Sequence, residues 1–215
     1  TLVALKYQGG IVLGADSRTS KSVIVSNKFA KKINVLIDNN DTTSKVAICR
    51  SGSAADTQFL SKAAKEEFRS RYWRYGFRNP TVSQVAHYLR SMMRSESNSG
   101  LQASLICAGV DCNDGDGDSD GIGRIFTVAI DGGAMWEEDV FCVSGSGSTF
   151  LLGYLDALKL DKNNLYTEDR AVELVTKLLQ LSIARDGASG GLIRLVILKK
   201  GVVEERTIYP LTGAN

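Results

Sequence analysis

The stretch TLVALKYQGGIVLGADSRTS, residues 1–20, contains two short apolar runs on either side of Gly9 and Gly10. This pattern is typical of a β-hairpin, because glycine accepts the positive φ angles of a tight turn. Neither run alternates apolar with polar residues, so both faces of each strand should be covered by other parts of the chain. We therefore expect this hairpin to lie in a sheet with packed layers on both sides.

Four helices are indicated by apolar side chains that recur every three or four residues. Their apolar faces comprise Leu60, Ala64, Phe68 and Tyr72; Val82, Val85, Ala86, Leu89 and Met93; Leu151, Tyr154, Leu155 and Leu158; and Val172, Val175, Leu179 and Ile183. Thr81 with Gln84 fits a capping box at the start of the second helix. Glu168 and Asp169 lie in the first turn of the fourth, where the helix dipole favours acidic residues.

Further strands are expected over residues 45–49, 101–110, 124–130, 134–139 and 140–145, with a closing hairpin over 191–209. The resulting order is strands, two helices, strands, two helices, strands. This order differs from the alternation of a parallel sheet and suits antiparallel strands with helices in pairs. We expect an α+β fold of two stacked antiparallel sheets with helices outside. No linker or repeat interrupts the chain, so residues 1–215 should form a single domain.

Composition and charge exclude several classes of protein. A net charge of +2 gives no reason to expect binding to nucleic acid, and the longest apolar runs, such as LVAL and LIRLVIL, are too short to cross a bilayer. Cys49, Cys107 and Cys142 lie in apolar stretches. They are interpreted as buried side chains in a reducing compartment, in preference to a disulfide or a metal site.

Three patterns that could carry chemistry have simpler explanations. His87 is the only histidine and lies off the apolar face of its helix, so we expect a surface residue and no Ser-His-Asp site. The run 113–123, NDGDGDSDGIG, matches the first half of a calcium-binding loop, but Thr127 falls where a bidentate acid is required. A solvated hairpin loop is the better interpretation. The run 144–149, SGSGST, lacks the ending of a phosphate-binding loop and indicates a strand-to-helix turn.

Thr1 carries a hydroxyl and an α-amine on one residue. The pKa of an α-amine is about 7.7–8.0, so near neutral pH the neutral amine can accept the proton of the hydroxyl. An N-terminal threonine can therefore act as an activated nucleophile without a histidine. The absence of an initiator Met suggests processing, through removal of either the Met alone or a propeptide.

Five motifs follow one another along nearly the whole chain: GGIVLGADSRTS, KKI, CRSGSAADTQ, SGSGSTFLLGYLD and ARDGASGGLIRL. Together they resemble a β-type subunit of the proteasome core particle, an N-terminal nucleophile hydrolase. RSGSAADTQ and RDGASGG are most similar to the caspase-like β subunit of eukaryotes, which cleaves after acidic residues. The resemblance implies a four-layer αββα sandwich and a threonine endopeptidase of unfolded polypeptides. It also implies stacked heptameric rings with other α and β subunits, no cofactor or metal, and residence in cytoplasm and nucleus.

The resemblance implies a catalytic role for six residues. Thr1 would supply the nucleophilic hydroxyl, and its α-amine would act as the base. Asp16 and Lys32 would form an ion pair that lowers the pKa of the hydroxyl. The amine and its proton path would be held by Ser146, Asp186 and Ser189.

Five further residues would bind the substrate. The backbone N–H of Gly52 would stabilise the oxyanion. Thr19 and Ser20 would hold the substrate backbone as an added strand, with Ala54 also in contact with the substrate. Arg50 directly precedes the turn that contains Gly52, so its guanidinium could bind the carboxylate of an acidic side chain before the cut.

Two other functions stay open on the sequence alone. A structural β subunit of the same ring would share the fold without activity, although such subunits usually lose the N-terminal Thr, the Lys or the glycine motifs. A free-standing amidohydrolase of the same superfamily would act on a small molecule, although the closeness of the proteasome motifs argues against it.

Asp16 and Lys32 each lie one residue nearer the start than the family pattern places them. Either a bulge in the first strand compensates for a true deletion of one residue, or the sequence lacks one residue before Thr1. We favour the second explanation, because the run that starts at Leu2 aligns with the first strand of the family without a gap. Thr1 should then point away from Lys32, since side chains alternate along a strand. A hydrogen bond between the Thr1 hydroxyl and the Lys32 amine would refute this.

Overall fold

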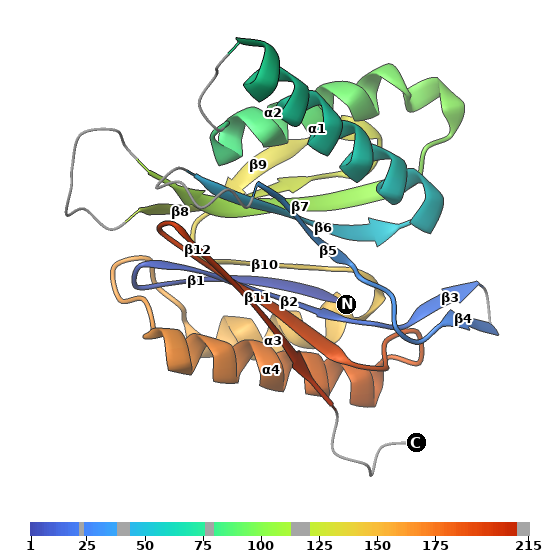
Figure 1. Ribbon diagram of the computed structural model, residues 1–215. Coiled ribbons are helices and arrows are strands. Elements are labelled where there is room, and N and C mark those ends of the chain that lie inside the picture. The colour runs from blue at the N-terminus through green and yellow to red at the C-terminus, as the bar shows by residue number, and fades with distance from the viewer. Residues whose placement is uncertain (22–23, 38–43, 76–79, 113–120, 210–215) are drawn as a thin grey trace.

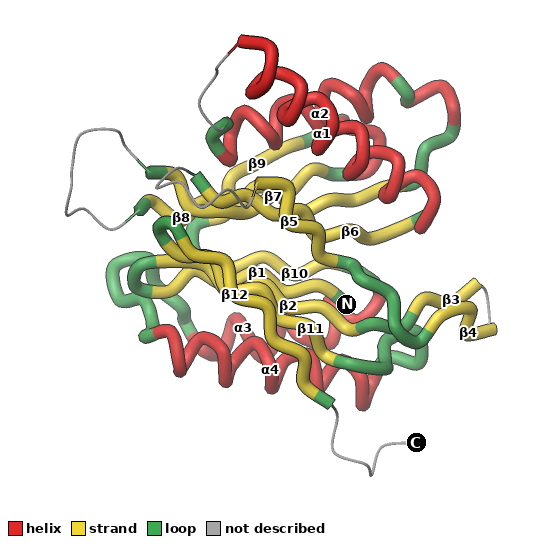
Figure 2. The backbone as a smooth tube through the Cα atoms, viewed as in Figure 1, coloured by secondary structure: helices red, strands yellow, loops and turns green. Residues whose placement is uncertain are grey.

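The structure, a computed structural model, describes residues 1–21, 24–37, 44–75, 80–112 and 121–209. Four layers stack in the order helices, sheet, sheet, helices (Figure 1). Figure 2 shows the two sheets in yellow between the outer helices in red. This arrangement confirms the predicted α+β sandwich.

The first sheet contains the N-terminal hairpin and has the strand order β10-β1-β2-β11-β12. Its strands are β1 (Leu2–Tyr7), β2 (Gly10–Asp16), β10 (Phe141–Ser144), β11 (Ile193–Lys199) and β12 (Val202–Ile208). Tyr7 pairs with Gly10, and Gly9 in the turn between them has a φ of 90°. β11 and β12 pair in the same way across a short turn, so both predicted hairpins are confirmed.

The second sheet has the strand order β5-β6-β7-β8-β9. Its strands are β5 (Ile33–Ile37), β6 (Lys45–Gly52), β7 (Ala103–Asp111), β8 (Ile122–Val128) and β9 (Met135–Glu138). A separate two-stranded ribbon joins β3 (Thr19–Lys21) to β4 (Ile24–Asn27). β3, β4 and β5 were not predicted from the sequence. All of β4 is exposed, so it has no buried face from which a periodic pattern could arise.

One pair of helices covers each sheet (Figure 1). The helices α1 (Ala54–Tyr75) and α2 (Val82–Ser95) lie on the second sheet, and α3 (Thr149–Leu158) and α4 (Glu168–Arg185) lie on the first. Short 3-10 turns occupy η1 (Ser97–Ser99), η2 (Ile130–Gly132) and η3 (Ser146–Ser148). The predicted capping box is confirmed, because Thr81 Oγ1 accepts from the N–H of Gln84, and the Gln84 side chain accepts from the N–H of Thr81. η3 connects β10 to α3, as expected for the run 144–149.

Three apolar clusters fill the spaces between the four layers. Leu60 and Leu89 belong to the cluster between α1, α2 and the second sheet, and Leu2 and Ile106 to the cluster between the sheets. Val3 packs in the third cluster, between the first sheet and α3 and α4. The hairpin strands therefore contact a layer on each face, which explains their unbroken apolar sequence.

Tyr72 belongs to the apolar face expected of α1 but lies outside the core. Its side chain is 40% exposed and packs edge-on against the ring of Trp73, with ring centroids 5.8 Å apart. Phe68, one turn earlier, is the last residue of α1 in the core. The helix thus continues beyond the surface that it covers, and its periodic pattern continues with it.

Other expectations concern single residues. Cys49, Cys107 and Cys142 are buried and His87 is exposed, as predicted. Residues 113–120, which hold most of the predicted hairpin loop with calcium-like spacing, lie outside the described residues. None of the helices described here is long and apolar enough to cross a membrane.

Candidate functional site

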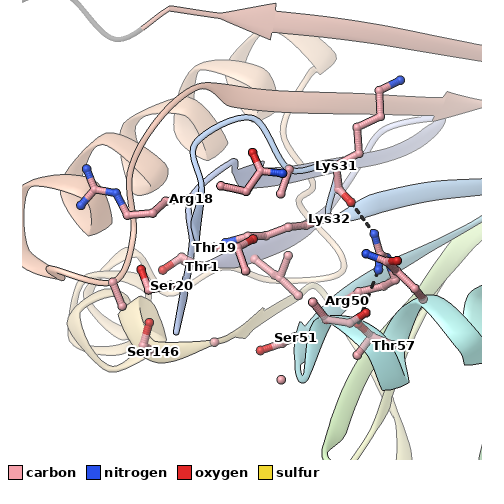
Figure 3. Close-up of a pocket in the computed structure, with 18 of the residues that line it drawn as sticks. Thr1, Arg18, Thr19, Ser20, Lys31, Lys32, Arg50, Ser51, Thr57 and Ser146 are labelled. Carbon is pink, nitrogen blue, oxygen red and sulfur yellow. Dashed lines mark hydrogen bonds between the residues drawn. The ribbon is translucent and has the colours of Figure 1, made fainter. Parts of the chain in front are cut away.

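A cleft of about 580 Å³ opens beside the start of β1, and residues of both sheets line it (Figure 3). The walls include the residues for which the sequence predicts contact with substrate: Thr19, Ser20, Arg50, Gly52 and Ala54. Thr1, Lys32 and Ser146 also line the cleft. The remaining predicted residues, Asp16, Asp186 and Ser189, are hydrogen-bonded directly to these three. The fold therefore brings every predicted site residue into one place.

Asp16 is the buried centre of this site. Its Oδ1 accepts from the α-amine of Thr1 and from Nζ of Lys32, each at 2.6 Å. Its Oδ2 accepts from the backbone N–H groups of Arg18 at 3.0 Å and Gly190 at 2.9 Å. A buried carboxylate is tolerated when paired and fully hydrogen-bonded in this way. Asp16 thereby holds Lys32, whose side chain is 18% exposed, against the wall of the cleft.

The hydroxyl of Thr1 points away from Lys32. The Thr1 side chain is completely buried, and its Oγ1 lies 2.5 Å from Ser182 Oγ and 2.8 Å from Ser189 Oγ. No hydrogen bond joins Thr1 Oγ1 to Lys32, both of which belong to the described part of the chain. This is the orientation expected if Thr1 occupies the second position of the strand.

Side chains at the start of β1 alternate between two layers. Val3 packs with the cluster under α3 and α4, and Leu2 packs with the cluster between the sheets and lines the cleft. Thr1 shares the direction of Val3, because its partner Ser182 belongs to α4. By the same alternation, the side chain of a residue attached to the amine of Thr1 would share the direction of Leu2. Such a side chain would face the cleft.

Asp186 directly follows α4, and its carboxylate accepts three hydrogen bonds. Ser146 Oγ and Ser189 Oγ donate to its Oδ2 at 2.6 and 2.7 Å, and the N–H of Ala188 donates to its Oδ1 at 3.0 Å. Burial raises the pKa of Asp186, but these hydrogen bonds and the nearby positive N-terminus outweigh it, so the pKa is lowered overall. The carboxylate is thus held in its charged form beside the N-terminus.

The α-amine of Thr1 is shifted toward its neutral form. Burial lowers its pKa, the charge of Asp16 opposes this shift, and the charge of Lys32 adds to it. A neutral amine is the form that can accept a proton. The shift therefore suits an amine at this position to the role of general base.

Gly52 presents bare backbone to the cleft at the end of β6. Its φ is 104°, and a Cβ added there would lie 2.4 Å from the carbonyl oxygen of Gln102. Only glycine fits such a position without a shift of the backbone. A substrate carbonyl can therefore approach the main chain here without meeting a side chain.

Arg50 is fixed in the cleft by three acceptors. Nη2 donates to the carbonyl oxygen of Lys31 at 2.5 Å, and Nη1 to Thr57 Oγ1 at 3.4 Å (Figure 3). Nε donates to Asn34 Oδ1 at 3.0 Å. A guanidinium has five N–H donors. Two donors are thus left over after these contacts, on a side chain that is only half-buried.

The charge of the cleft lining is entirely positive among the described residues. Arg18, Lys31, Lys32 and Arg50 line it, and no Asp or Glu does so. Arg50 and Arg18 lie toward opposite ends, with Thr1 between them (Figure 3). Such a surface favours an anionic partner. The described residues contain no group of three or more His, Cys, Asp or Glu arranged to hold a metal ion.

Ser182 is hydrogen-bonded to Thr1 but was not predicted from the sequence as part of the site. It lies on the buried face of α4 together with Leu178 and Leu179. A serine on an otherwise apolar face was the available signal, because a buried hydroxyl needs a hydrogen-bond partner. That its partner would be Thr1 depends on the tertiary fold.

Comparison with known proteins places the chain in one family. Residues 1–198 match the proteasome subunit family. The chain is 38% identical over 210 residues to "Proteasome subunit beta type-6" of Arabidopsis thaliana, an alignment that covers 98% of this chain and 81% of that protein. It is 34% identical to "Probable proteasome subunit beta type-1" of Schizosaccharomyces pombe, covering 100% and 86%. It is 31% identical to "Proteasome subunit beta type-1" of Saccharomyces cerevisiae, covering 98% and 88%.

Proposed function

The chain belongs to the proteasome subunit family as a β-type subunit of the core particle, and we propose that it is a threonine-type endopeptidase that cuts unfolded polypeptides after acidic residues. Family membership implies assembly with other proteasome subunits. One observation carries the proposal of catalysis: the buried Asp16 holds Lys32 at the wall of the cleft, beside the start of β1.

This arrangement suits the activation of a hydroxyl. The positive charge of Lys32 lowers the pKa of a hydroxyl placed beside it. A neutral α-amine can accept the hydroxyl proton, as in the pairing of a threonine with its own N-terminal amine. Ser146, Asp186 and Ser189 supply a hydrogen-bonded path for that proton.

We assign the attacking hydroxyl to a residue attached to the amine of Thr1. Thr1 Oγ1 is enclosed by Ser182 and Ser189, whereas the next side chain toward the N-terminus would face the cleft and Lys32. The one-residue offset of Asp16 and Lys32 from the family pattern supports the same assignment. The α-amine that acts as base then belongs to that preceding residue.

The reaction proceeds through an ester. The hydroxyl oxygen attacks the carbonyl carbon of the peptide, its proton passes to the amine, and the N–H of Gly52 stabilises the oxyanion. The C–N bond breaks as the leaving amine takes up the proton. Water then hydrolyses the ester and restores the hydroxyl. Thr19 and Ser20 in β3 hold the substrate as an added strand opposite Ala54 at the start of α1.

The acidic preference is supported by Arg50 and by the charge of the cleft. Two N–H donors of Arg50 remain after its three contacts, which matches the two oxygens of a carboxylate. No acidic side chain among the described lining residues would repel that carboxylate. The substrate residue before the cut is therefore assigned as Asp or Glu.

A structural subunit without activity is the second candidate function. If Thr1 is the first residue of the mature chain, its hydroxyl is enclosed and no free hydroxyl faces Lys32. That case favours the structural role.

The two functions differ in the effect of Lys32→Met on assembled particles. Cleavage of fluorogenic peptides after Glu should fall at least about 100-fold in the Lys32→Met particle, with Lys62→Met on the exposed face of α1 as the matched control. Cleavage after Glu that is the same in both variants would support the structural role.

A further inference from the structure

We propose that Ser182 is a positioning residue for the catalytic centre, because it directs a chain of hydrogen bonds that runs through Thr1 and Ser189 to Asp186. This inference rests on the proposed function. It concerns a residue that lines no part of the cleft and does not touch the substrate.

Ser182 connects the start of β1 to the segment that follows α4. Its side chain is fully buried in the last turns of α4, with Oγ 2.5 Å from Thr1 Oγ1. Its carbonyl oxygen accepts from the N–H of Asp186 at 2.8 Å. One residue thus holds both the start of β1 and the carboxylate that follows α4.

The direction of each hydrogen bond in this row follows from its last acceptor, the carboxylate of Asp186. Asp186 Oδ2 accepts from Ser189 Oγ, so the single proton of Ser189 is committed to the carboxylate. Ser189 Oγ must then accept from Thr1 Oγ1, which uses the single proton of Thr1. Thr1 Oγ1 in turn accepts from Ser182 Oγ. The order of donation is therefore Ser182, Thr1, Ser189, Asp186.

Close packing prevents the hydrogen-bonded hydroxyls of Ser182 and Thr1 from rearranging. A Cβ added to Gly147 would lie 2.0 Å from Thr1 Oγ1 and 2.1 Å from Ser182 Oγ, so the backbone of η3 closes the space around both hydroxyls. Donors in a buried row polarise one another, so loss of the first weakens the last. Without Ser182, Thr1 Oγ1 loses a donor and its side chain can rotate, and the bond from Ser189 to Asp186 weakens.

The test is Ser182→Ala in the assembled particle, with cleavage after Glu measured as a function of pH. We expect kcat to fall about tenfold, the loss of one net hydrogen bond, while KM changes less than about twofold. The acid limb of the kcat profile should move to higher pH, because a weaker donor to Asp186 raises the pKa of its carboxyl. Thr176→Ala removes another hydroxyl of α4, one that donates to the carbonyl oxygen of Val172, and should change none of these values.

The results of these measurements distinguish a positioning role of Ser182 from a merely structural one, and both from a failure of the proposed function. A Ser182→Ala particle with lower thermal stability but an unmoved acid limb and an unchanged kcat would overturn this inference and leave the proposed function intact. A wild-type particle in which this subunit cleaves nothing would overturn the proposed function and the inference with it. A shift of the acid limb without a change in KM supports positioning.

Discussion

Lys32 Nζ lies 2.6 Å from Asp16 Oδ1, in an ion pair whose carboxylate is completely buried while the lysine reaches the cleft. This pair joins the end of β2 to the segment before β5, and so connects the two sheets at the candidate site. The same oxygen accepts from the Thr1 amine. The site is therefore organised around one carboxylate, and the first prediction concerns its charge.

Asp16→Asn should unfold the site as well as inactivate it. The change leaves Lys32 without its counter-charge, and breaking a buried pair in this way costs about 3–5 kcal/mol. Limited proteolysis of this chain in urea, within the particle, measures the loss. Asp156→Asn on the exposed face of α3 is the matched control and should stay within about 0.5 kcal/mol. Equal urea resistance of the two variants would show that the pair does not stabilise the fold.

Arg50→Met should redirect cleavage from acidic toward apolar residues, because it removes the guanidinium but keeps an unbranched side chain in the cleft. Comparing kcat/KM for peptides with Glu, Gln and Leu before the cut measures the change. Arg170→Met on α4, whose side chain is exposed, serves as control. If the Arg50→Met particle keeps its preference for Glu, the assignment of the acidic pocket is wrong.

Asn34→Leu should lower the same preference less strongly. It removes the acceptor of Arg50 Nε but leaves the contacts to Lys31 and Thr57, so the guanidinium gains freedom without losing its charge. We expect about a three- to tenfold loss of kcat/KM for Glu with little change for Leu, consistent with one net hydrogen bond. Equal losses for both peptides would instead indicate a general distortion of the cleft.

The lowered pKa of Asp186 predicts how the stability of this chain depends on pH. The ordinary pKa of an aspartate is about 3.9. The hydrogen bonds to the carboxylate contribute their full stability above that value, and this contribution is lost as the pH falls through the lower pKa of the folded state. Wild type and Asp186→Asn should therefore differ in urea resistance at pH 6 and converge as the pH falls below the ordinary pKa of about 3.9 and then below the lower pKa of the folded state. A difference that persists unchanged at acid pH would show that the charge of Asp186 is not responsible.

Much of the fold could be predicted from local patterns. The hairpin turn at Gly9, the capping box at Thr81 and most of the apolar faces of the helices are features of short segments, and the structure contains them. β3 and β4 could not be predicted, because a short exposed ribbon buries no periodic face. Tyr72 was misjudged for the opposite reason, since a helix can keep its period after its partner surface has ended.

The site residues likewise include some that could be predicted from the sequence and some that could not. The positions of Lys32, Arg50 and Gly52 followed from motifs, and the structure brings them to one cleft, with Asp16 paired to Lys32 behind its wall. The contact between Ser182 and Thr1 could not be derived, because it joins residues 181 positions apart through the docking of α4 on β1. The orientation of Thr1 follows from the register of β1, which the offset of Asp16 and Lys32 indicated.

The most direct test of the account is to locate the residue that a covalent, N-terminal-threonine-directed inhibitor modifies in this subunit. Particles produced from the full-length gene would be treated with the inhibitor, and the N-terminal peptide of the mature chain would be sequenced by mass spectrometry. We predict an adduct on a residue that precedes Thr1, and labelling that persists in a Thr1→Val variant. An adduct on Thr1 itself, or a subunit that takes up no inhibitor while its active neighbours do, would contradict the account.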